Sequence, residues 1–301
     1  MAQMVIDTLG LGRAIYWDQL TISMDEHEKQ YTQILSEANT TQQFERIGQL
    51  TGLGYPQHAV EGSPIANDAR RTLYTQDFYP AIYGISYEWT DVAEYTDQYN
   101  KFKENPMLAA KSMSQGRELA GANVLNNGFS SSFVGADGVA LFSTAHPTNG
   151  GATWSNRPSS ALALGTSSLK QAKSEMRRVK DPRNMPMGFK GNVMLVVPPE
   201  LEVTADILLT SSTIPFAANF GDNHYKDRVT KKFVMDELTS ATAWFLVAED
   251  KSKHGLFMLF GMPLSVETQR TAITKSTTYV TAETRVTGWK HPYGVWGTPG
   301  A

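Results

Sequence analysis

Three side chains near the middle of the chain carry groups that can act together in hydrolysis. They are the carboxyl of Asp137, the hydroxyl of Ser143 and the imidazole of His146. A serine, a histidine and an acid form the triad that activates the serine for acyl transfer. The local sequence also has a simpler interpretation, which we favour: Asp137-Gly138 is a hairpin turn signal, and His146 precedes a proline in a polar loop. Because a triad is recognised by geometry, the spacing leaves a hydrolase using His146 as an alternative.

The other histidines form no familiar metal or cofactor motif. No two of the six are spaced i, i+4, and neither HExxH nor a glycine-rich phosphate loop occurs. Asp222 and Asp227 flank His224, but the surrounding glycine and asparagine residues are more typical of a loop than of a metal site. We therefore expect no catalytic residue, no bound cofactor and no metal ion.

A small basic cluster lies in the second half of a predicted amphipathic helix over residues 167–180. It contains Lys173, Arg177, Arg178 and Lys180. The simplest interpretation is a solvated helix face. An alternative is a face that lies toward a DNA backbone, since phosphate binding depends mainly on lysine and arginine.

The composition bounds the class of protein. The 301 residues can build a sizeable core or two moderate domains, and the charged fraction of 19% is below the usual ~25%. A net charge of −3 argues against a transcription factor or a polymerase. The absence of cysteine excludes disulfides and thiol catalysis, and no apolar run approaches the roughly 20 residues that span a bilayer. Without a signal-peptide pattern, we expect folding in the cytosol and no membrane contact.

The longest predicted helix covers residues 106–127. Pro106 suits a first helical turn, and Asn126-Asn127-Gly128 is a typical stop. Gly116 and Gly121 reduce helix propensity by roughly 1 kcal/mol each relative to alanine. We expect them to permit close approach of a neighbouring backbone.

Residues 25–39 predict a short polar helix, and residues 40–90 predict a two-stranded excursion with a tip rich in glycine and proline. An isolated hairpin is marginally stable in water. The excursion therefore either lies on another chain or forms a meander within its own domain.

The second half of the chain predicts a new compact unit that begins near Gly191. Five consecutive apolar residues at 193–197 indicate a buried strand, which Pro198 and Pro199 end before a helix over residues 200–209. Further strands are expected at 228–235, 243–248, 256–260, 264–269 and 278–289. The fold class is α+β with mostly antiparallel pairing.

The order of these elements resembles the major capsid proteins of tailed bacteriophages, including Mu-type head subunits, which share the Hong Kong 97 fold. The resemblance rests on the small-residue helix followed by the Asp137-Gly138 hairpin and its loop to Asn156. It also rests on the junction from Leu195 to Glu202 and on the closing segment from Trp289 to Gly297. No single motif is diagnostic, and the combination carries the resemblance.

The resemblance implies a division of the chain. The expected parts are an N-terminal arm (1–24), a short helix (25–39), an extended loop (40–90), a peripheral domain (91–192) with a spine helix (106–127), an axial domain (193–270) and a return strand with the C-terminus (271–301). Residues expected between subunits are Trp17, Tyr74, Phe78, Tyr83, Gly116 and Gly121.

The implied function is structural. Hexamers and pentamers of the chain would form an icosahedral shell that encloses double-stranded DNA without sequence-specific binding. A separate scaffolding protein, a portal and a decoration protein are the implied partners, with assembly in the host cytoplasm and final location in the virion. An encapsulin-like compartment is an alternative with the same fold, and the hydrolase using His146 is the alternative from another class.

Overall fold

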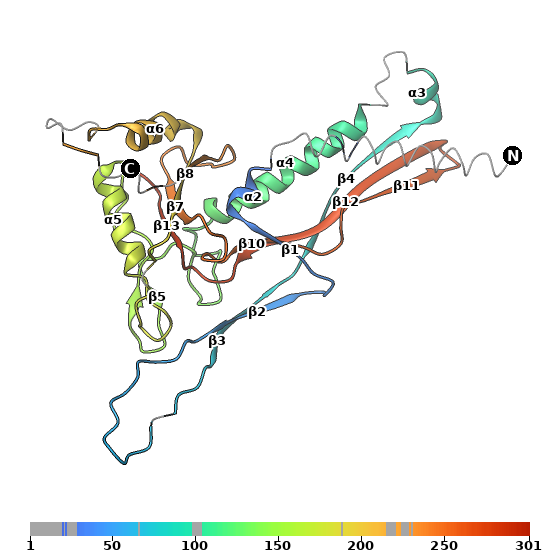
Figure 1. Cartoon of the computed structure of the whole chain (residues 1–301). Coiled ribbons are helices and arrows are strands. Elements are labelled where there is room, and N and C mark those ends of the chain that lie inside the picture. Colours follow the sequence, from blue (N-terminus) through green and yellow to red (C-terminus); the bar gives the residue numbers. More distant parts are fainter. Residues whose placement is uncertain are drawn as a thin grey trace.

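The computed structural model describes residues 20, 22, 29–65, 67–97, 104–187, 189–214, 221–223, 229 and 231–301. Two larger β-sheets and their helices form the body, and a two-stranded ribbon extends away from it (Figure 1). This mixture of helices and mostly antiparallel strands confirms the predicted α+β class. In the described part of the chain, no helix has both the length and the apolar character needed to cross a membrane.

The first sheet is built around its longest strand, β12. Its strands are β1 (Ser36–Asn39), β4 (Ala81–Thr90), β10 (Leu256–Phe260), β11 (Ser265–Thr271) and β12 (Ser276–Trp289). β10 and then β11 pair antiparallel with successive stretches of β12, while β1 adds parallel to β10. Because residues 276–282 pair with both β4 and β11, those two strands flank β12 on opposite edges. The short helix α3 (Asp91–Tyr95) follows β4 directly.

The second sheet has the order β13-β9-β7-β8 and lies between two apolar cores. Its strands are β7 (Val193–Val197), β8 (Lys231–Val234), β9 (Trp244–Ala248) and β13 (Val295–Thr298). Val193, Leu195 and Val197 pack with α5 (Thr166–Arg177) and α6 (Glu202–Thr210). Met194 and Val196 join the core on the opposite face. Because both faces of β7 are covered, its sequence is continuously apolar rather than alternating.

Helix α4 (Asn105–Asn126) confirms the predicted long helix within one residue at each end. Its small residues, including Ala122, pack in the same core as Tyr31 and Leu35 from the segment around α2 (Tyr31–Ile34). That core also holds Met258 of the first sheet and Phe245 of the second. The two sheets are therefore connected through shared apolar packing rather than by a flexible linker.

The predicted excursion is a ribbon of β2 (Glu45–Leu50) and β3 (Thr72–Phe78), paired antiparallel, with an irregular tip over residues 51–71. The ribbon projects from the body in Figure 1. The interpretation that extended it to residue 90 is corrected, since β4 pairs with β12 in the first sheet. The aromatic and β-branched residues of 81–90 predicted a strand, but they did not reveal its partner.

The helix expected over residues 25–39 is also corrected. Residues 23–28 lie outside the described part, α2 covers only Tyr31–Ile34, and residues 36–39 form β1. Leu35 is already extended, and the hydroxyl of Ser36 donates to the carbonyl of Leu256 at 2.8 Å. Pairing with β10 satisfies the backbone groups that another helical turn would otherwise have paired.

Sheet membership departs from the division expected near residues 193 and 270. β10 and β11 were expected in the second unit but belong to the first sheet. β13 was expected in the same unit as the return strand, but it belongs to the second sheet. The chain therefore crosses between the two sheets more often than a linear division implies. Short elements complete the structure: a two-residue ladder of β5 (His146–Pro147) and β6 (Thr153–Trp154), and a 3₁₀ turn at Pro199–Leu201 before α6.

Candidate assembly surfaces

Polar contacts stabilise the root of the ribbon, the paired strands β2 and β3 where they leave the body. The Arg46 guanidinium donates to both carboxylate oxygens of Asp77, with each N–O distance 2.7 Å. The side-chain amide of Gln49 donates to the hydroxyl of Tyr293 at 2.6 Å, which connects β2 to the segment before β13. These contacts fix the direction in which the ribbon leaves the body.

The tip is connected to the loop after α5. Asp68 pairs with Arg183, and its Oδ2 also accepts a hydrogen bond from the backbone N–H of Gly54 at 2.7 Å. The hydrogen bond from Arg183 is the largest cause that lowers the pKa of Asp68 to about 2. Arg183 also donates to the carbonyl of Ala69 at 2.7 Å. The two ends of the tip are thus positioned by polar groups.

The apolar side chains of the tip face solvent. Leu53 and Tyr55 are 55% and 66% exposed, and Val60 and Ile65 are 67% and 84% exposed. Apolar side chains clustered on a protruding surface typically mark a contact with another molecule. The tip is the strongest candidate for a surface that is completed by a second chain.

The predicted inter-subunit aromatic residues differ in their placement. Phe78 is 6% exposed, and its ring packs edge-on against Phe257 of the same chain with centroids 4.9 Å apart. Its burial therefore needs no neighbouring subunit. Tyr74 is half-buried and Tyr83 is 44% exposed, so both retain surface for an interface, which stays a prediction. Trp17 lies outside the described residues.

Both predicted helix glycines make close approaches within the chain. A Cβ on Gly121 would lie 2.6 Å from the Cβ of Tyr31, and a Cβ on Gly116 would lie 3.0 Å from a guanidinium nitrogen of Arg285. At Gly121 the approach is to the base of a side chain on α2, whereas at Gly116 the neighbour is the end of a side chain from β12 rather than a backbone. A role for either glycine between subunits remains a prediction.

A buried charge cluster joins α4 to the first sheet. The fully buried carboxylate of Glu283 on β12 pairs with Arg117 of α4 and accepts a hydrogen bond from Arg285 at 2.5 Å. Arg285 also lies over the ring of Tyr83 on β4, 4.2 Å from its centroid. These contacts fix the helix against the long strands at one position along their length.

His146 is engaged in structural contacts. Its Nδ1 lies 2.7 Å from Asp137 Oδ2 and its Nε2 lies 3.1 Å from Asn156 Oδ1, while its ring stacks on Trp154 with centroids 4.5 Å apart. The hydroxyl of Ser143 instead accepts the backbone N–H of Ala145 at 3.1 Å. With both ring nitrogens occupied, His146 is not positioned to take a proton from Ser143. The arrangement joins the Asp137-Gly138 turn to the following loop.

Two further histidines are packed near the ribbon root. Burial lowers the pKa of both His254 and His291 to about 4. His291 packs against Tyr293 with ring centroids 5.1 Å apart, and it lines a groove of about 660 Å³ between β2 and the loop after α5. Within the described ranges, no group of three or more histidine, aspartate or glutamate side chains could hold a metal ion. His224 and Asp227 of the candidate metal loop lie outside those ranges.

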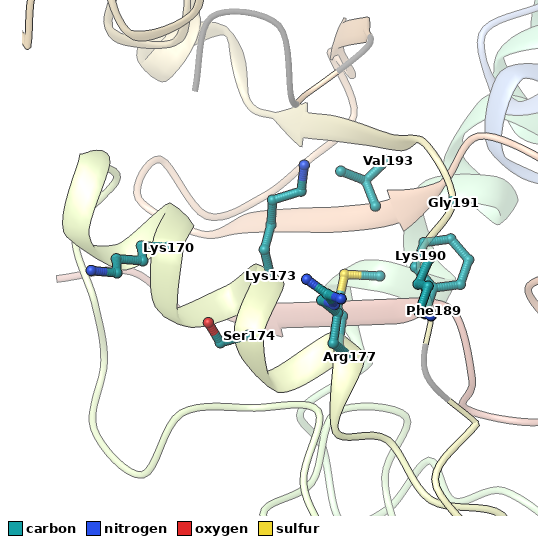
Figure 2. A pocket seen from close by; sticks show the side chains of 9 residues that line it. Lys170, Lys173, Ser174, Arg177, Phe189, Lys190, Gly191 and Val193 are labelled. Atoms are coloured by element: carbon teal, nitrogen blue, oxygen red, sulfur yellow. The ribbon is translucent and has the colours of Figure 1, made fainter. Parts of the chain in front are cut away.

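A second concavity lies beside α5 and is shown in Figure 2. Lys173 and Arg177, two members of the predicted basic cluster, line it, whereas Arg178 and Lys180 do not. Lys170 and Lys190 complete its basic lining. Nothing in the sequence indicated that Lys190 belongs with this cluster, because a loop separates it from the helix.

Comparison with known proteins gives one family and one fold. The family model described as phage capsid protein matches residues 73–297, about three quarters of the chain. No curated protein matches the sequence.

Several solved shell structures share the fold at low sequence identity. The capsid of cyanophage P-SCSP1u aligns with a TM-score of 0.59 and 9% identity over 90% of this chain and 87% of that chain. The mature capsid of bacteriophage PhiM1 aligns with a TM-score of 0.58 and 11% identity over 90% and 86%. A virus-like particle from Pyrococcus furiosus aligns with a TM-score of 0.53 and 9% identity over 95% and 96%.

Proposed function

Because this chain belongs to the phage capsid protein family, we propose that it is the repeating major subunit of an icosahedral head shell that encloses phage DNA. The Hong Kong 97-type fold implied by the sequence is the fold it shares with the capsid subunits of cyanophage P-SCSP1u and phage PhiM1. Its role is structural, and its final location is the capsid of the virion.

The exposed apolar tip of the ribbon is the observation that best supports self-assembly. Two strands paired only with each other are marginal in water, and this ribbon projects from the body (Figure 1). Its apolar tip side chains lack a covering core. Burial against a second copy would remove them from water, at roughly 25 cal/mol per Å² of apolar surface. The ribbon is therefore the part of the extended loop that reaches over a neighbouring subunit.

We assign the two sheets to the two units of a shell subunit, although β10, β11, α5 and β13 then fall in other units than the division expected from the sequence. The first sheet, with α4 along it, acts as the peripheral unit, and the second sheet, with α5 and α6, acts as the axial unit around five-fold and six-fold axes. The assignment of residues 1–24 to an N-terminal arm concerns a segment that lies almost wholly outside the described residues, and it stays a prediction. Hexamers and pentamers assemble with a separate scaffolding protein, a portal and a decoration protein, in the host cytoplasm.

The two alternatives are less well supported. An encapsulin-like compartment would share the fold, but the matching family model is that of phage capsid proteins. A hydrolase using His146 would need a nearby nucleophile, and both ring nitrogens of His146 already face Asp137 and Asn156.

Size-exclusion chromatography followed by negative-stain electron microscopy tests the function. We expect shells, sheets, tubes or rings of five or six subunits, with or without a co-expressed scaffolding protein. A chain that remains monomeric in both conditions would contradict the proposal.

A tip variant tests which surface drives assembly. Replacing Tyr55, Val60 and Ile65 together by serine removes exposed apolar surface, and we expect assembly to be lost while the monomer stays folded. The matched control replaces the exposed tip residues Gln57 by serine and Glu61 by glutamine, and it should assemble normally. Normal assembly of the apolar variant would show that the tip is not an interface.

A further inference from the structure

The cavity beside α5 has a volume of about 410 Å³ and a strongly basic lining. Lys170, Lys173 and Arg177 come from α5, where spacings of three and four residues place side chains on one face of a helix. Lys190 comes from the segment that leads into β7. Figure 2 shows Lys173 extending from the helix toward Val193 and Arg177 on the side of Phe189, whereas the Lys170 side chain points away from both.

Among the described residues, no carboxylate lines this cavity. Glu175 of the same helix is engaged elsewhere: it accepts hydrogen bonds from the Trp296 indole at 2.7 Å and from Gln171 at 2.8 Å. Among the described residues, Lys170, Arg177 and Lys190 form no ion pair with a carboxylate. Like charges gathered this closely repel one another, and a bound anion would relieve that repulsion.

Besides Ser174 and Gly191, the rest of the lining is apolar. Met176 and Val193 are 2% and 1% exposed and belong to the core beneath the second sheet. Phe189 packs against that core and presents an aromatic ring at the cavity wall. The floor of the concavity is therefore part of a packed core, while Lys170, Arg177 and Lys190 are exposed around it.

We propose that this basic cavity binds phosphate groups of a nucleic-acid backbone. Arginine donates paired hydrogen bonds to phosphate oxygens, and lysine contributes a mobile point charge, so the cavity offers both kinds of contact. Because the whole chain carries a net charge of −3, attraction of a polyanion must come from a local cluster of this kind.

The inference deepens the proposed function and rests on it in one respect: inside a shell, the phosphate-bearing ligand is the enclosed DNA. The cavity would then fasten the backbone to the axial unit without reading its sequence, since phosphate contacts carry no base information.

Fluorescence anisotropy with the unassembled protein tests the site. The probes are a labelled 20-base-pair duplex and the corresponding single strand, with polyglutamate and inorganic phosphate as competitors. We expect nucleic acid to bind with an affinity that falls steeply with salt, by a slope of about 0.9 per phosphate contact for duplex.

The triple variant Lys170→Gln, Arg177→Gln and Lys190→Gln should weaken binding by roughly tenfold or more and reduce the duplex salt slope by up to about 2.7. The control variant Lys111→Gln, Lys253→Gln and Lys275→Gln makes the same charge change at exposed positions on other elements and should bind like the wild type. The proposed site would be contradicted if both variants lost the same affinity for nucleic acid or if neither lost any. Preferential binding of polyglutamate would contradict it as well.

Electron microscopy of the same triple variant separates this inference from the proposed function. Normal shells with unchanged DNA binding would refute the cavity alone. DNA binding that depends on the cavity, in a chain that never assembles, would support the cavity and refute the shell.

Discussion

Gly121 of α4 lies directly against Tyr31 of α2, so close that a Cβ on the glycine would lie 2.6 Å from the Cβ of the tyrosine. Tyr31 is fully buried, and its backbone N–H donates to the Glu118 carboxylate at 2.8 Å one turn earlier on the helix. Its hydroxyl donates to Glu37 at 2.7 Å. The absence of a side chain at residue 121 is what allows this segment to rest on the helix.

Gly121→Ala should therefore destabilise the fold. Overpacking typically costs about 1–3 kcal/mol, and alanine returns up to about 1 kcal/mol of helix propensity, so we expect a net loss of about 1–2 kcal/mol. Urea unfolding of the unassembled protein, followed by circular dichroism, measures the change.

Gly116→Ala is the matched control on the same helix. Its Cβ would lie 3.0 Å from a guanidinium nitrogen of the buried Arg285, a contact that a shift of a few tenths of an ångström relieves, so we expect a smaller loss of stability than for Gly121→Ala. Equal destabilisation by the two substitutions would contradict the close-approach argument.

The Arg117–Glu283–Arg285 cluster gives a second prediction. Glu283→Gln would leave two guanidinium groups near a neutral amide in a buried site, and removal of one partner of a buried ion pair typically costs about 3–5 kcal/mol. Denaturant unfolding should detect a loss of this order. The exposed pair of Arg46 and Asp77 supplies the comparison, because water screens this pair and Arg46→Gln should cost far less than Glu283→Gln. A smaller effect for Glu283→Gln than for Arg46→Gln would refute the stabilising role of the cluster.

His146 allows a test that separates a structural role from a catalytic one. His146→Ala would leave the Asp137 and Asn156 oxygens without their ring partner and remove the stack on Trp154, so we expect roughly 1–3 kcal/mol of destabilisation. Ser143→Ala should cost about 1 kcal/mol or less, because its hydroxyl accepts a single backbone N–H. Thermal unfolding and an ester-hydrolysis assay check both variants. Turnover in the wild type that both substitutions abolish would restore the hydrolase interpretation.

Elements that the sequence predicted well are those whose specification is local. β7 was recognisable because five apolar residues end at two prolines, and the structure buries both of its faces. α4 was recognisable from Pro106 and from its stop signal after residue 125, and the tight turn at Asp137-Gly138 is confirmed by a φ of +77° at Gly138. In each case the signal and the structure lie within the same few residues.

Elements that were missed depend on partners far along the chain. Ser36-Glu37-Ala38-Asn39 is polar and has little strand propensity, and it becomes β1 because β10 offers an edge more than 200 residues later. β4 was predicted as a strand but assigned to the ribbon, because nothing in residues 81–90 indicates pairing with β12. The sequence predicted a basic cluster but no cavity: Lys173 and Arg177 of that cluster line it, whereas Lys190 comes from another segment that only the fold brings close.

The buried histidines predict that the protein loses stability in mild acid. Burial holds the folded-state pKa of His254 and His291 at about 4, below the ordinary value of 6.5, so the unfolded chain binds more protons between these values. The stabilisation is complete above pH 6.5 and is lost as the pH falls toward 4. Each histidine contributes a slope of up to roughly 1.4 kcal/mol per pH unit.

Substitution of the two residues tests this dependence. The charged groups that affect the pair, Asp250, Lys251 and Lys290, remain in place in His254→Gln and His291→Gln, so any change in slope comes from the imidazoles. Urea unfolding of the unassembled protein at pH 7.5, 5.5 and 4.5 should show a shallower fall in each single variant and the shallowest in the double variant. Because Gln cannot gain a proton in this range, slopes that match the wild type in all three variants would assign the acid sensitivity to other groups.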